Sequence, residues 1–108
     1  MIPEVYRPYI QKIIEKTNDN DAKWEMTGEK SYFLRTSAAT IEIGYYVDQD
    51  AELSYYYFKF FNIKNKTDAG FRVNNLEEDY LIMEKLYSVA AASAANIKDE
   101  LSSFLDDL

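Results

Sequence analysis

The sequence predicts one α+β domain covering residues 1–108, and three observations lead to this interpretation. Apolar residues have helical spacing near the N-terminus, alternate with polar residues through the middle, and return to helical spacing towards the C-terminus. A chain of 108 residues is long enough for one domain with its own core. We therefore expect an N-terminal helix, an antiparallel meander of four to five strands, and a long or broken C-terminal helix packed on one sheet face.

The N-terminal helix is predicted from three isoleucines. Ile10, Ile13 and Ile14 have helical spacing between Pro8 and a polar run that begins at Thr17. Pro8 suits the first turn, where a missing N–H costs nothing.

The strands are predicted between residues 23 and 74, where the apolar pattern has a period of two. Trp24 and Met26 mark a first strand, a turn follows at residues 28–30, and Tyr32 begins a second strand. Residues 40–47 and 52–63 are rich in β-branched and aromatic residues, which suit a pleated surface. A short fifth strand is expected at residues 71–73.

The register of the central hairpin is predicted from a four-residue loop at residues 48–51, which would place Val47 opposite Glu52. Tyr55 would then lie opposite Gly44 and cover its bare backbone. Residues that face each other in an antiparallel pair share a sheet face. The face expected to form the core contains Ile41, Ile43, Tyr45, Tyr56, Phe58 and Phe60.

The C-terminal segment is predicted to be helical from about residue 76 to Leu108, with Asn74 or Asn75 as a cap. A continuous helix of about 32 residues would be roughly 48 Å long, whereas the domain should be about 35 Å across. Either the helix breaks near residues 93–96, with Asn96 capping a second helix that folds back, or it continues and packs against another chain. In the second alternative, the possible dimer contacts are Ile97, Leu101, Phe104 and Leu105.

The composition offers little for catalysis. The chain has no cysteine and no histidine, and its three glycines are scattered. Glu42 beside Tyr57 is the best candidate for an acid–base role, although an acid on a solvated strand face explains it better. Asp48, Asp50 and Glu52 alternate as in a calcium loop but lack its glycine and distal glutamate. We expect no enzyme, no catalytic residue, no metal and no cofactor.

The charge of the chain argues against two classes of partner. The net charge is −7, and the twelve basic residues are spread along the sequence. Such a surface repels nucleic-acid phosphates and anionic lipids. The N-terminus lacks the pattern of a signal peptide, and no apolar stretch is long enough to span a membrane. We expect a cytoplasmic protein that binds no nucleic acid and no membrane.

The ten tyrosines suggest a surface for recognition. Tyr46, Tyr55 and Tyr57, together with Leu53, are expected on the sheet face opposite the core. Tyrosine is favoured at interfaces, since it offers a large area at low entropic cost. The alternative is that tyrosine is simply a good strand former.

Several short patterns carry a resemblance. They are Trp24, the alternation Tyr56-x-Phe58-x-Phe60-x-Asn62, the run from Glu78 to Tyr87, and Asn96-Ile97. In these the chain resembles small uncharacterised bacterial proteins with a helix, a short meander and a C-terminal helical segment. The resemblance implies this architecture and no activity.

The function expected from the sequence is that of a non-enzymatic protein-interaction or regulatory module, which binds a protein partner or associates with itself. The alternative is a small apolar-ligand-binding protein with a cavity between the sheet and the C-terminal helix.

Overall fold

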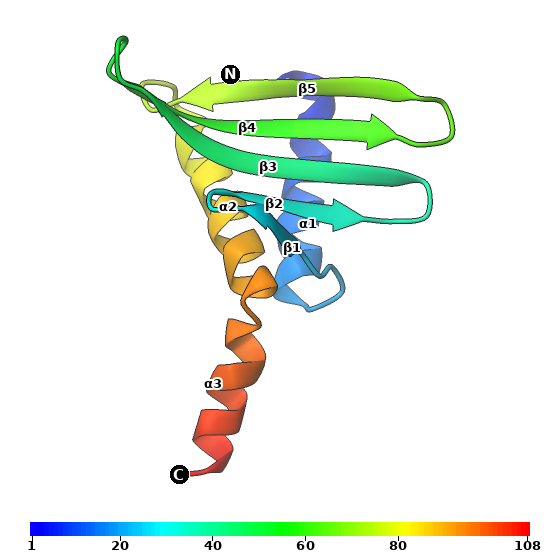
Figure 1. Cartoon of the computed structure of the whole chain (residues 1–108), viewed down its shortest axis with the longest axis vertical. Coiled ribbons are helices and arrows are strands. Elements are labelled where there is room, and N and C mark those ends of the chain that lie inside the picture. Colours follow the sequence, from blue (N-terminus) through cyan, green and yellow to red (C-terminus); the bar gives the residue numbers. More distant parts are fainter.

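The computed structural model describes residues 1–97 and 99–108 and confirms the α+β fold. One antiparallel sheet has the strand order β1-β2-β3-β4-β5, so each strand pairs with its neighbour in sequence. The helices α1 and α2 both cross the same face of this sheet (Figure 1). The elements are η1 (Glu4–Tyr6), α1 (Arg7–Asn18), β1 (Glu25–Gly28), β2 (Ser31–Arg35), β3 (Ala39–Asp48), β4 (Leu53–Asn62), β5 (Thr67–Asn74), α2 (Tyr80–Ala94) and α3 (Ile97–Asp106).

The central hairpin, β3 and β4, has a register displaced by two residues from the predicted one. Val47 pairs with Ser54 and not with Glu52. The loop is residues 49–52, because the Asp48 carboxylate accepts hydrogen bonds from the backbone N–H groups of Asp50 and Ala51. A displacement of two residues leaves every side chain on its predicted face, because side chains alternate with a period of two.

The core lies between the sheet and the two helices that cover it. Ile10 and Ile14 of α1 and Leu86 of α2 are almost fully buried, as are Ile43 and Val73 of the sheet. The predicted spacing of isoleucines in the first helix is thus explained by burial on one side of α1. We call this covered side of the sheet the inner face and the opposite side the outer face.

Two hydrogen bonds of Trp24 join the C-terminal ends of α1 and α2. Its indole N–H donates to the Thr17 hydroxyl at 2.9 Å, and its backbone N–H donates to the Ser93 hydroxyl at 3.0 Å. Trp24 and Thr17 are both buried. Trp24, which directly precedes β1, therefore links the start of the sheet with both α1 and α2.

The segment before α2 is a turn where the sequence predicted the helix to begin. The Asn74 side chain accepts a hydrogen bond from the Leu76 N–H, and Glu77 accepts one from the Asn74 N–H. These bonds close the turn on itself, so α2 begins only at Tyr80. Leu76, expected on the apolar side of the helix, is 79% exposed.

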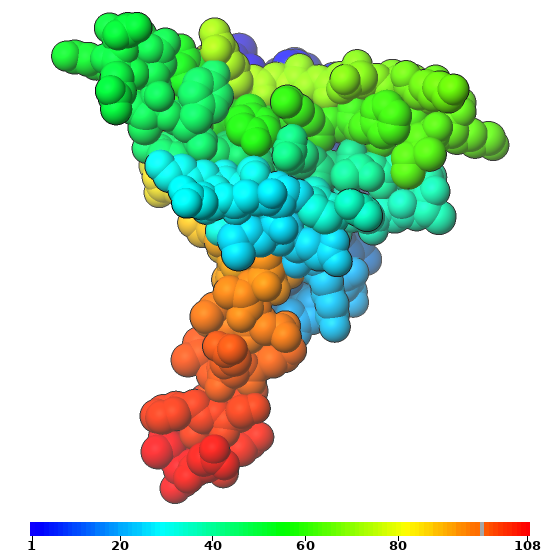
Figure 2. All heavy atoms as spheres, in the orientation of Figure 1, coloured from blue at the N-terminus to red at the C-terminus, as the bar shows by residue number. Residues whose placement is uncertain are grey.

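The C-terminal helical segment breaks where expected but does not fold back. Asn96 has a left-handed backbone (φ 58°, ψ 30°) between α2 and α3. It makes no side-chain capping bond, and α3 leads away from the domain (Figures 1 and 2). The radius of gyration is 14.9 Å, against about 13 Å for a compact chain of this length. The structure therefore matches neither of the two expected arrangements in full. The helix breaks, as in the first, but α3 projects away from the domain instead of folding back onto it.

Candidate functional site

The tyrosine face, defined as Tyr46, Leu53, Tyr55 and Tyr57, lies on the outer face of β3 and β4 as predicted. Tyr46 pairs with Tyr55, and their rings stack with centroids 5.0 Å apart. The Tyr57 ring lies 6.2 Å from that of Tyr46. The structure thus brings the three predicted tyrosines together in one cluster.

A cation from β5 completes this cluster. The Arg72 guanidinium lies 4.5 Å from the centre of the Tyr55 ring and donates a hydrogen bond of 2.8 Å to the Tyr46 hydroxyl. That hydrogen bond raises the pKa of Arg72. Held between Tyr46 and Arg72, Tyr55 is only 8% exposed, which corrects the expectation that it is an exposed residue. Much of the tyrosine face is therefore already engaged within the domain, because the Tyr46 hydroxyl and the Tyr55 ring both contact Arg72.

The candidate acid–base pair on this face is Glu42 and Tyr57, and the charge of Glu42 acts on the Tyr57 phenol. Burial and the charge of Glu42 raise the pKa of the Tyr57 phenol, while a hydrogen bond with Ser31 lowers it by a smaller amount. The phenol is therefore protonated at neutral pH. Across residues 1–97 and 99–108 there is no group of three or more acidic, histidine or cysteine residues able to hold a metal ion.

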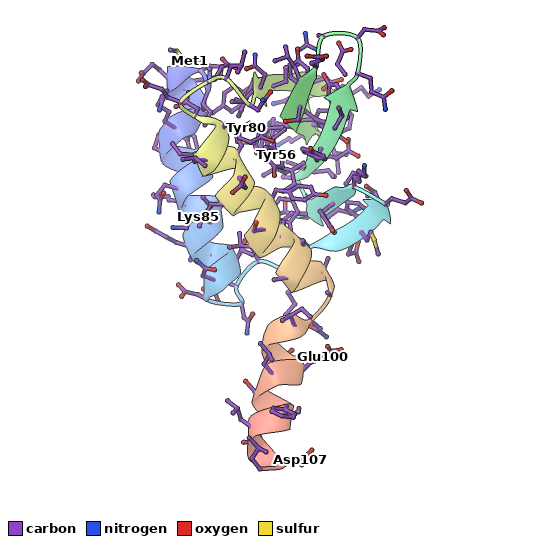
Figure 3. The ribbon with its side chains drawn as sticks, turned by 90° about the vertical axis from the view of Figure 1, so that its left-hand side faces the viewer. Met1, Tyr56, Tyr80, Lys85, Glu100 and Asp107 are labelled. Atoms are coloured by element: carbon purple, nitrogen blue, oxygen red, sulfur yellow. The ribbon has the colours of Figure 1, made fainter. Side chains whose placement is uncertain are left out.

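Five further tyrosines form an inner cluster that the sequence analysis did not recognise. Tyr56 of β4 lies at its centre and faces Tyr80 of α2 (Figure 3). Its ring centroid is 4.9 Å from that of Tyr80 and 5.2 Å from that of Tyr87, also on α2. Tyr32 and Tyr45 contact Tyr87 from the sheet. The spacing of Tyr80 and Tyr87, two helical turns apart, was the available signal. This cluster is part of the packing between α2 and the sheet.

The apolar side of α3 forms an exposed stripe. The predicted dimer contacts Leu101, Phe104 and Leu105 are 59–67% exposed, and Ile97 is 40% exposed. Leu108 continues the stripe and is 86% exposed. Helical spacing puts the first four on one side of α3, and Leu108 follows just beyond the end of the helix. We call these residues the α3 stripe: Ile97, Leu101, Phe104, Leu105 and Leu108.

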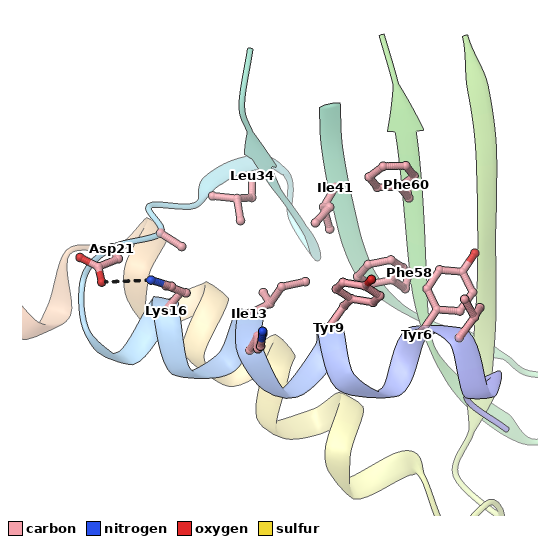
Figure 4. Close-up of a pocket in the computed structure, with 12 residues that line it drawn as sticks. Tyr6, Tyr9, Ile13, Lys16, Asp21, Leu34, Ile41, Phe58 and Phe60 are labelled. Atoms are coloured by element: carbon pink, nitrogen blue, oxygen red, sulfur yellow. Dashed lines mark ion pairs between the residues drawn. The ribbon is translucent and has the colours of Figure 1, made fainter. Parts of the chain in front are cut away.

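A second apolar surface is a groove between α1 and the inner face of the sheet (Figure 4). It has a volume of about 570 Å³. Val5 and Tyr9, on the helical side, are 68% and 62% exposed. We call this the α1 groove; its apolar walls are formed by Val5, Tyr6, Tyr9, Ile13, Leu34, Ile41, Phe58 and Phe60.

The α1 groove differs in position from the cavity that the sequence suggested, which was between the sheet and the C-terminal helix. That space is filled, because Met83 and Leu86 of α2 are at most 1% exposed against the sheet. The long strands β3 and β4 extend past α1 on the other side (Figure 1). Their ends, which carry Ile41 and Phe60, are only half-buried and form one wall of the groove.

Comparisons of the sequence with known protein families and with curated proteins, and of the fold with solved structures, gave no match. None of the helices in the described part of the chain is long and apolar enough to cross a membrane. The arguments for function therefore rest on three surfaces of this chain, namely the tyrosine face, the α3 stripe and the α1 groove.

Proposed function

We propose that this protein is a non-enzymatic interaction module and that α3 is its binding element. The observation that carries the proposal is the exposure of the α3 stripe, which lies beyond the end of the domain. Burying a leucine-sized side chain contributes roughly 1.5–3 kcal/mol. Four such side chains on one short helix, with Leu108 just beyond its end, are a strong driving force for association.

The length of α3 supports the same conclusion. It has 10 residues, and isolated helices shorter than about 12–15 residues are marginal in water. The left-handed Asn96 separates α3 from the hydrogen bonding of α2. A partner surface that covers the stripe would supply the stabilisation that α3 does not receive from its own domain.

The polar side of α3 indicates how such a helix binds. Asp99 and Asp106 lie roughly opposite the stripe, and Glu100 and Asp107 lie along one edge of it, on a helical projection. A helix with one apolar side and charged residues elsewhere is suited to an apolar groove on its partner. We therefore expect recognition by insertion of a helix into a groove.

A photo-crosslinking experiment tests this function. A photoreactive amino acid replaces Phe104 in the stripe, and the matched control carries it at Ser103, on the other side of α3. We expect adducts of defined mass from position 104 and few from position 103, because only the stripe is covered by a partner. Equal yields from the two positions, or no adduct from either, would contradict the proposal.

A second candidate function is the binding of a small apolar ligand, favoured by the α1 groove. Its volume of about 570 Å³ is in the range of small-molecule sites, and its lining is mainly apolar. Native mass spectrometry of the purified protein tests this function. Extra mass that is lost in an Ile13→Glu variant would support ligand binding, and the bare mass of the chain would count against it.

A further inference from the structure

We propose that the partner of α3 is a second copy of this chain, with the α3 of each copy lying in the α1 groove of the other. The inference rests on the proposed function of α3 and names its partner. It starts from two apolar surfaces, the α3 stripe and the α1 groove, that are both uncovered in one chain. The stripe is a projecting apolar surface without a cover, and the groove is an apolar hollow that such a surface can fill.

The two surfaces match in length. The groove is lined from Val5 to Ala22 and so extends along the whole of α1. With 12 residues, α1 is about 18 Å long, whereas α3 with 10 residues is about 15 Å long. One α3 therefore fits along the groove with its four apolar side chains directed between α1 and the sheet.

The two surfaces also match in charge. Lys12 and Lys16 lie on the α1 side of the groove, and both are exposed. On α3, Glu100 and Asp107 lie along one edge of the stripe (Figure 3), and the last turn has no basic residue. A docked α3 can place this acidic edge beside the two lysines.

Lys16 is available for such contacts. It forms an ion pair with Asp21, in which the nitrogen–oxygen distance is 3.9 Å (Figure 4). Both side chains are more than 60% exposed. An exposed pair with this distance contributes little, so an approaching carboxylate can replace Asp21 at low cost.

The connection to α3 favours a second copy over the groove of the same chain. Only Ala95 and Asn96 separate α2 from α3, and the backbone at Asn96 directs α3 away from the sheet. Reciprocal exchange about a twofold axis forms the same contact twice. Two contacts bring the buried area closer to the roughly 1,200–2,000 Å² that is typical of a stable interface.

A charge-exchange experiment tests this arrangement. The groove variant carries Lys12→Glu and Lys16→Glu, and the helix variant carries Glu100→Lys and Asp107→Lys. Each variant alone juxtaposes like charges in both contacts of a homodimer. In a mixture of the two, one contact has the native charges and the other has the exchanged charges, so both are complementary.

Sedimentation velocity over a range of concentrations provides the readout. We expect the unchanged chain to be dimeric, each variant alone to dimerise at least tenfold more weakly, and the equimolar mixture to regain the dimer. All four substitutions lie on exposed side chains. Fluorescence of the buried Trp24 verifies that each variant is folded.

Other outcomes overturn the proposal in distinguishable ways. A dimer that is lost on Leu101→Asp but unaffected by the charge variants would place α3 against another surface; the function proposed for α3 would stand and the groove would not. A monomer with slow hydrogen exchange in α3 would show docking within one chain. A monomer with fast exchange in α3 would rule out a second copy, and the crosslinking experiment would then decide whether α3 binds another protein.

Discussion

The ring of Tyr57 lies directly across the backbone of Gly44 on the neighbouring strand. The two residues pair in the central hairpin, and a Cβ atom at residue 44 would overlap the phenol of Tyr57. Gly44 is buried for this reason, although it lies on the outer face. The absence of a side chain at residue 44 gives the aromatic ring its place.

This relationship predicts the effect of adding one methyl group. Gly44→Ala should lower the free energy of unfolding by about 1–3 kcal/mol, because the Tyr57 ring has to move. Gly28→Ala is the matched control. Its Cβ would meet only the rotatable Ser31 hydroxyl, at 3.2 Å, so a change within about 0.5 kcal/mol is expected. Urea denaturation followed by Trp24 fluorescence measures both, and equal losses would contradict the explanation.

The same hairpin indicates how far the sequence determines the sheet. The alternation of apolar and polar residues placed every side chain of β3 and β4 on its correct face. It could not distinguish registers that differ by two residues, because both sort the side chains identically. The choice between them depended on Asp48, which accepts hydrogen bonds within the loop. We expected Tyr55 to cover the backbone of Gly44, but in the structure Tyr57 covers it.

A second prediction concerns the tyrosine face. Tyr55→Ala should lower the free energy of unfolding by about 2 kcal/mol, since the ring is almost fully buried between Tyr46 and Arg72. Phe61→Ala, on the same strand and face, is the control, because Phe61 is 42% exposed. It should cost clearly less. If Tyr55→Ala left the thermal unfolding midpoint unchanged, the Tyr55 side chain would be exposed and not part of the packing.

A third prediction concerns acid. Asp79 accepts hydrogen bonds from the Ile2 N–H at 2.8 Å and from the Arg7 guanidinium at 2.9 Å. These interactions, led by the Ile2 N–H, lower the pKa of Asp79 from its ordinary value of 3.8. Its contribution to stability should therefore be complete above about pH 4 and be lost as the pH falls further.

The variant Asp79→Asn tests this origin of acid sensitivity. It should be less stable than the unchanged chain at pH 7, and the difference should shrink below pH 4. Glu78→Gln, which removes an exposed carboxylate of the same segment, is the control. Urea midpoints at a series of pH values provide the measurement, and a difference that persists unchanged into acid would contradict the assignment.

A fourth prediction concerns alkali and the inner tyrosine cluster. Burial and the neighbouring Tyr32 raise the pKa of Tyr87 to about 12. Burial and Tyr80 raise the pKa of Tyr56 still further. Because the folded chain holds these protons more tightly than the unfolded chain, stability should be full below pH 10 and fall as the pH rises from 10 to about 12.

Tyr87→Phe should lessen this loss of stability in alkali, since one of the responsible phenols is gone. Tyr9→Phe, at a position that is 62% exposed, is the control. Denaturation midpoints between pH 8 and pH 11.5, with tyrosinate absorbance as an independent probe, follow the change. Identical alkaline profiles for the two variants would be evidence against a role for Tyr87.

The candidate surfaces were less predictable than the sheet. The apolar residues of α3 and the break near Asn96 were visible in the helical spacing. The direction of α3 was not, because it depends on one left-handed backbone conformation. The α1 groove was also hidden, since its two walls come from separate segments, up to Ala22 and from Leu34 onward, that meet only in the folded domain.

The hydrogen bond between Ile2 and Asp79 spans 77 positions of the chain, whereas every strand pairs with its immediate neighbour. During synthesis the five strands can therefore form their hairpins in the order in which they leave the ribosome. The first helix cannot complete its packing in that order. Ile10 and Ile14 reach their final environment only after α2, from Tyr80 onward, has been made. Until then the nascent domain exposes the apolar side of α1.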